Sequence, residues 1–73
     1  MATRRIDNRG LHPPEPMVRI LSAIQELGEG DALEALMDRE PRLLYPELER
    51  RGFTWEFAAL DGDFLLTVRR AGG

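Results

Sequence analysis

Residues 6–16 read Ile-Asp-Asn-Arg-Gly-Leu-His-Pro-Pro-Glu-Pro, and the fold is decided in this stretch. A weakly strand-forming run over residues 3–8 leads into it, and Arg9-Gly10 supplies a turn. The three prolines that follow hold the backbone extended or at the start of a helix, because each ring fixes φ and removes an N–H donor. The stretch therefore predicts a strand, a turn and the opening of a helix.

An amphipathic helix is predicted directly after this stretch. Apolar side chains recur at positions i, i+3, i+4, i+7 and i+10, which are Met17, Ile20, Leu21, Ile24 and Leu27. This spacing places them on one helical face. Gly28 is expected to end the helix in a left-handed conformation.

Residues 31–37, Asp-Ala-Leu-Glu-Ala-Leu-Met, fit two structures. Helix propensity is high, and Asp31 with Glu34 three residues later resembles a capping box. Alternation instead predicts a strand with Leu33, Ala35 and Met37 on one face. The local features favour a helix but leave both structures open.

The remainder of the chain predicts a short helix and a β-hairpin. Pro46 divides or kinks a helix over residues 41–51, because a proline inside a helix lacks the N–H and crowds the preceding turn. Residues 53–59 and 64–69 alternate as strands do, and the tight-turn pair Asp61-Gly62 joins them.

The amino-acid composition excludes several kinds of chemistry. The 73-residue chain has no cysteine, which excludes disulfides, thiolate metal sites and a thiol nucleophile. All ten positive charges are arginine, so no lysine is present to form a Schiff base. His12 is the only histidine, too little for a histidine-rich metal site or a self-contained Ser-His-Asp triad.

The charge and hydropathy of the chain predict a small protein that binds neither nucleic acid nor membranes. The net charge is −3, and ten arginines are interleaved with thirteen acids, whereas a nucleic-acid-binding domain needs a basic balance for phosphate contacts. No apolar run approaches the roughly 18 residues of a membrane span. Arg4 and Arg5 interrupt any apolar core of a signal peptide, so a cytoplasmic protein is expected.

The opening stretch resembles the SirA/TusA-type family of small sulfur carriers, in which a strand is followed by Arg-Gly-Leu and then Cys-Pro-x-Pro. Arg9-Gly10-Leu11 and Pro14-Glu15-Pro16 match, and Pro13 occupies the cysteine position. The chain is still more similar to a branch of this fold that has no assigned role and lacks the cysteine. Members of that branch share Pro-Pro-Glu-Pro, Asp38-Arg39-Glu40-Pro41 and the run here written Tyr45-Pro46 to Phe53.

The resemblance implies an α/β two-layer sandwich of order β-α-β-α-β-β, with two helices on one face of a mixed four-stranded sheet. It assigns residues 31–37 to a strand, against their propensity. One domain over residues 1–73 is expected, with an ordered core of about 4–70 and a frayed end from Ala71. The apolar face of the first helix is expected to pack on Leu33, Ala35, Leu44, Leu48, Trp55, Phe57, Leu66 and Val68.

Function does not follow from the fold alone. Pro13 has no thiol, so this chain cannot carry a persulfide, and no acid–base pair suggests an enzyme. We therefore expect a non-catalytic binding domain, without a cofactor, whose partner is another protein; a homodimer is also compatible with the sequence. The predicted binding surface comprises Arg9, His12, Pro13, Pro14, Glu15, Asp38, Arg39 and Glu40.

Each of these residues also has a purely structural interpretation. The proline segment fixes the angle at which the helix starts, and Asp38 or Glu40 caps the second helix with Arg39 in solvent. An alternative function is an accessory metal- or haem-binding domain of redox or nitrogen-oxide metabolism. In that alternative His12, with Met17, supplies the ligands.

Overall fold

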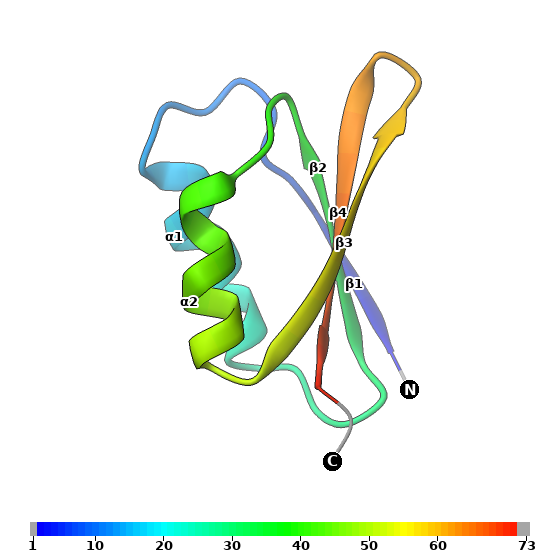
Figure 1. Ribbon diagram of the computed structural model, residues 1–73. Coiled ribbons are helices and arrows are strands. Elements are labelled where there is room, and N and C mark those ends of the chain that lie inside the picture. The colour runs from blue at the N-terminus through cyan, green and yellow to red at the C-terminus, as the bar shows by residue number, and fades with distance from the viewer. Residues whose placement is uncertain (1, 72–73) are drawn as a thin grey trace.

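Two helices lie on one face of a four-stranded sheet in the computed structural model, which describes residues 2–71 (Figure 1). This arrangement confirms the predicted two-layer α/β sandwich and its order. The elements are β1 (Thr3–Asp7), α1 (Glu15–Ile24), β2 (Ala32–Met37), the 3₁₀ turn η1 (Arg42–Leu44), α2 (Tyr45–Arg50), β3 (Phe53–Leu60) and β4 (Asp63–Arg70).

The sheet is mixed, with strand order β1-β2-β4-β3. β1 and β2 are parallel and are joined through α1, whereas β4 runs antiparallel to both β2 and β3. The register places Ala35 beside Ile6 on one side and beside Leu66 on the other. β2 is therefore a central strand with a ladder on each side, and these two ladders override its helix propensity.

The core lies between the helices and the sheet. Nine of the predicted core residues are buried, namely Ile20, Ile24, Leu27, Leu33, Ala35, Leu44, Leu48, Leu66 and Val68. Met17, Leu21, Trp55 and Phe57 are only partly buried against this core. The Trp55 ring stacks on Tyr45 with centroids 4.9 Å apart, so it covers the edge of the core.

The first helix starts within the proline stretch that was expected to open it, but its predicted end at Gly28 is wrong. α1 begins at Glu15 and ends at Ile24, and Leu27 is buried in a following turn in which its N–H donates to the Ile24 carbonyl at 3.1 Å. The Gly28 N–H donates to Asp31 Oδ2 at 2.9 Å, and the left-handed glycine of this loop is Gly30, with φ of 80°. Asp31 thus closes a loop and caps no helix.

Backbone geometry decides one open alternative and confirms one turn. Of the two structures that Pro46 left open, the divided one is present, as the separate elements η1 and α2, and Gly52 follows α2 with φ of 83°. Asp61 and Gly62 both have positive φ, which is the type I′ hairpin turn.

The Ala71 N–H, for which fraying was predicted, donates to the Gly52 carbonyl at 2.8 Å. The rest of that predicted frayed end, Gly72 and Gly73, lies outside the described residues. No helix within residues 2–71 is long and apolar enough to cross a membrane.

Candidate functional site

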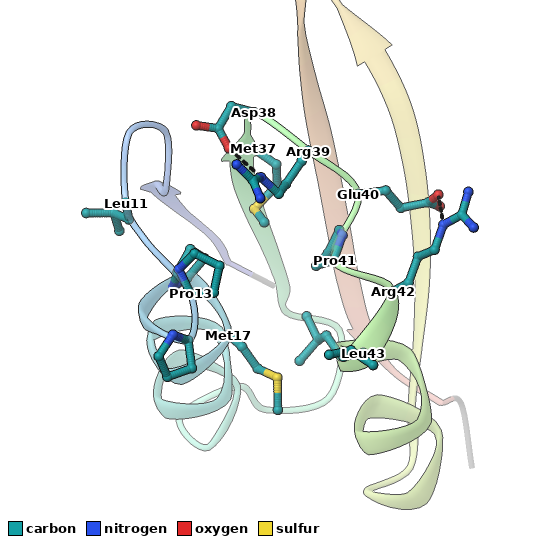
Figure 2. A pocket seen from close by; sticks show the side chains of 13 residues that line it. Leu11, Pro13, Met17, Met37, Asp38, Arg39, Glu40, Pro41, Arg42 and Leu43 are labelled. Carbon is teal, nitrogen blue, oxygen red and sulfur yellow. Dashed lines mark hydrogen bonds and ion pairs between the residues drawn. The ribbon is translucent and has the colours of Figure 1, made fainter.

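A cleft of about 220 Å³ opens between the start of α1 and the loop that leads from β2 into η1 (Figure 2). The β1–α1 connection forms one wall and residues 37–44 form the other. The lining residues are Leu11, Pro13, Pro14, Pro16, Met17, Met37, Asp38, Arg39, Glu40, Pro41, Arg42, Leu43 and Leu44. Two segments far apart in sequence therefore meet here because β1 and β2 are parallel neighbours in the sheet.

The walls of this cleft are mainly apolar. Proline rings cover the α1 side, since three prolines open that helix. Figure 2 shows Met17 reaching from α1 toward η1, which carries Leu43. Leu43 is 85% exposed, the highest exposure among the large exposed apolar side chains of the described residues. An exposed leucine beside an apolar cleft is a feature of binding surfaces.

Two acids at the rim hold the loop in place. Asp38 Oδ2 accepts the Gly10 N–H at 2.9 Å and so ties the loop after β2 to the turn after β1. Glu40 accepts Arg42 Nε at 3.1 Å and the Tyr45 hydroxyl at 3.0 Å. Neither η1 nor α2 has a side-chain cap, so the predicted capping role of Asp38 and Glu40 is wrong. Their carboxylates are instead used in cross-links between loops.

The hydrogen bond from the Tyr45 hydroxyl holds the Glu40 carboxylate in position. Burial, and after it the hydrogen bond to the Glu40 carboxylate, together raise the pKa of Tyr45 to about 12. The hydroxyl therefore stays protonated and remains a donor at neutral pH. Because the same ring stacks on Trp55, the rim of the cleft is connected to β3.

Arg39 is the rim residue with the weakest internal contact. Its Nε lies 4.0 Å from Asp38 Oδ1, and its side chain is 73% exposed. A surface pair of this length contributes little to stability. The guanidinium is thus available to bind a carboxylate on another molecule.

Three residues of the predicted surface lie outside the cleft lining, namely Arg9, His12 and Glu15. Arg9 forms ion pairs with Asp7 at 2.7 Å and Asp63 at 3.0 Å, and so links the end of β1 to the start of β4. The hydrogen bonds from Arg9 hold the pKa of Asp7 at about 2, below its usual 3.8, and raise the pKa of Arg9. Arg9 is therefore a structural cross-link.

His12 and Met17, the two ligands of the alternative metal or haem site, do not lie together at the cleft. His12 is exposed and its carbonyl accepts the Glu15 N–H at 2.9 Å, whereas Met17 lines the cleft. Within residues 2–71 no group of three His, Cys, Asp or Glu side chains is placed to hold a metal ion.

Five residues of the predicted binding surface line the cleft together, but the prediction did not include the apolar side chains between them; the five are Pro13, Pro14, Asp38, Arg39 and Glu40. The omission of Leu43 matters most. A signal was present, because Leu44 and Leu48 already form the inner edge of this segment and Leu43 falls beside that edge.

A buried polar side chain lies behind the cleft wall. Asn8 is 1% exposed, and its Nδ2 donates to the Pro16 carbonyl at 3.1 Å and to Met37 Sδ at 3.7 Å. Both acceptors belong to residues that line the cleft. Asn8 Oδ1 is buried and has no hydrogen-bond partner among the described residues. Asn8 thus joins the end of β1 to both walls.

Comparison with protein families identifies the family of this chain. The model of the family described as uncharacterized conserved protein, DUF2249, matches residues 5–70. The chain belongs to the DUF2249 family. The DUF2249 chain is similar to a crystal structure of a SirA-like protein from Desulfitobacterium hafniense, with 26% identity, 100% of both chains covered and a TM-score of 0.69. A search of curated proteins finds no match.

This DUF2249 domain has the SirA-like fold, and prolines stand at the opening of α1. Pro13 stands where the resemblance places a cysteine, and it lines the cleft with Pro14. No lining residue is a cysteine, serine, threonine or histidine. The described lining therefore offers apolar contact and two exposed guanidinium groups, of which Arg42 is held by Glu40 and Arg39 has only a long contact with Asp38.

Proposed function

We propose that this DUF2249 chain is a non-catalytic binding domain that docks an apolar segment of a partner protein in the cleft. The exposure of Leu43, 85% beside a proline-lined wall, carries the proposal. Covering such a side chain gains about 25 cal/mol for each Å² of apolar surface removed from water. Cysteine persulfide transfer is not part of this function, because the chain has no thiol.

The chemistry of the cleft describes the segment that it would accept. The apolar walls suit apolar side chains of an extended peptide, and Arg39 at the rim would pair with an acidic residue next to them. Asp38 and Glu40 are engaged by Gly10, Arg42 and Tyr45, so they contribute a fixed rim more than new contacts. Apolar burial would therefore supply affinity, and Arg39 would supply orientation.

Selection from a displayed peptide library, followed by titration of the selected peptides, tests this proposal. Wild-type chain should select peptides that combine apolar residues with an acid. Leu43→Glu should weaken their binding at least about tenfold, because it places a charge on the apolar wall. NMR shift changes on binding should map to residues 11–17 and 37–44.

Val18→Glu is the matched control for this substitution. Val18 is also an exposed aliphatic side chain, at 56%, but it lies on α1 outside the cleft lining. The control should bind the selected peptides as the wild type does. Equal loss of binding in both variants, or unchanged binding by Leu43→Glu, would show that the cleft is not the docking site.

We also propose that the domain works without a bound metal or haem, since His12 and Met17 supply only two ligands at separate places. Native mass spectrometry of freshly purified protein should give only multiples of the 8.3 kDa chain. A reproducible additional mass that disappears in His12→Ala would instead support the accessory metal- or haem-binding function.

A further inference from the structure

β3 forms an exposed edge of the sheet. It runs for eight residues, Phe53–Leu60, and pairs only with β4 in the described part of the chain. Its hairpin turn lies at the end of the sheet away from both helices (Figure 1). The last three residues of β3, residues 58–60, are exposed and apolar, with Leu60 at 42%.

The hydrogen-bonding direction of each β3 residue follows from its register. The Gly52 carbonyl accepts the Ala71 N–H next to the strand, and the type I′ turn closes on the Leu60–Asp63 pair. Even-numbered residues of β3 therefore face β4, and odd-numbered ones point their N–H and C=O groups outward. Among residues 2–71, no hydrogen bond outside the strand pairs uses the backbone of Phe53, Trp55, Phe57 or Ala59.

The other edge of the sheet is protected, whereas β3 is not. β1 is five residues long and carries Arg4, Arg5 and Asp7. β3 is longer, has no proline and carries a single charge at Glu56. Natural sheets usually cover or charge such an edge, because unpaired strand groups recruit another strand.

We propose that β3 pairs antiparallel with β3 of a second copy of this chain, about a two-fold axis at Phe57. The pairing joins two four-stranded sheets into one of eight strands. It uses the outward groups of both strands, and it closes as a dimer because each copy contributes the same edge. Further pairing of copies through β1 is disfavoured, because the charged side chains of Arg4 and Arg5 lie on that edge strand.

Charge sets the register. With the axis at Phe57, Glu56 lies opposite Ala58 of the second copy, and Trp55 lies opposite Ala59. Moving the axis by one residue to Glu56 would place two glutamates directly opposite each other, which destabilises a strand pair. With the axis at Phe57, residues 54–60 of one strand lie opposite residues 60–54 of the other, so almost all of β3 is paired. The two copies are thus self-complementary along this edge.

Sedimentation of the wild-type chain and of two substitutions at one exposed position tests this dimer. Wild type should show a concentration-dependent dimer. Ala58→Arg should tighten it about fivefold, because each new arginine faces Glu56 of the second copy. Ala58→Glu should weaken it by a similar factor, and thermal unfolding should show that both variants remain folded.

Ala59→Pro separates edge pairing from any other dimer. This substitution removes an outward N–H without breaking the ladder to β4, and proline is tolerated on edge strands at such positions. It should weaken the dimer at least about tenfold, since two donors are lost by symmetry. A monomer at millimolar wild-type concentration overturns the proposal. So does a dimer that Ala59→Pro leaves unchanged, or one that Ala58→Arg weakens.

Discussion

Leu44→Ala is expected to lower the free energy of unfolding by about 3 kcal/mol, whereas Leu43→Ala should change it by less than about 0.5 kcal/mol. The two leucines are neighbours in η1, but Leu44 is fully buried and Leu43 is 85% exposed. Truncating Leu44 removes apolar contacts and leaves a cavity, whereas truncating Leu43 removes a side chain that mostly contacts water. Urea unfolding followed by the fluorescence of Trp55 measures both values.

The size of the first effect is large for this protein. A chain of 73 residues is expected to have a stability of about 4–11 kcal/mol, so Leu44→Ala should remove a substantial part of it. The small effect of Leu43→Ala matters equally. If Leu43→Ala cost as much as Leu44→Ala, Leu43 would be covered in solution, and the observation that carries the proposed function would be lost.

The fold was predictable from sequence where a pattern is local. The Asp61-Gly62 turn needs positive φ at both positions, and alternation on either side of it defines the two strands. β2 was not predictable in this way, since its sequence favours a helix. Its strand comes from pairing with β1 and β4, which lie about 30 residues away on either side. Only the resemblance to a known family carried that long-range information.

The site was less predictable than the fold because its character depends on which side chains remain uncovered. Asp38 and Glu40 have residue types that suit either a cap or a binding rim. Their actual partners, Gly10 and Tyr45, follow from the positions of the loops in space. Leu43 is missed for the same reason, since its identity as a leucine predicts burial. The spacing of Leu44 and Leu48 places Leu43 beside the buried edge, but how much of its side chain stays exposed depends on the packed structure.

Asn8 shows how the site depends on the strand beneath it. Its backbone N–H donates to the Leu36 carbonyl at 2.9 Å, which extends the β1–β2 pairing by one residue. Its side-chain amide then donates to the Pro16 carbonyl and Met37 Sδ, one on each wall of the cleft. A buried amide with specific hydrogen bonds is costly to replace, because its acceptors lose that hydrogen bond in a place where water does not replace it.

Asn8→Asp is accordingly expected to lower the free energy of unfolding by about 3 kcal/mol at pH 7. The substitution replaces an amide donor by a carboxylate, which faces the Pro16 carbonyl without a proton to share. Burial raises the pKa of the new carboxyl in the folded protein above its unfolded value of about 3.9. The variant should therefore recover stability below that unfolded pKa and lose it as pH rises through the folded value.

The comparison has to be made against wild type at each pH, because Asp7 changes stability in the opposite direction. The pKa of Asp7 is lowered to about 2, so its contribution is present above 3.8 and is lost as pH falls through about 2. Asn8→Ala is the control, since it removes the same donor without adding a charge. Its cost should be independent of pH, and the gap between the two variants should close in acid. A gap of equal size at pH 7 and pH 3.5 would mean that the new carboxyl reaches water, and that the walls of the cleft do not depend on a buried amide.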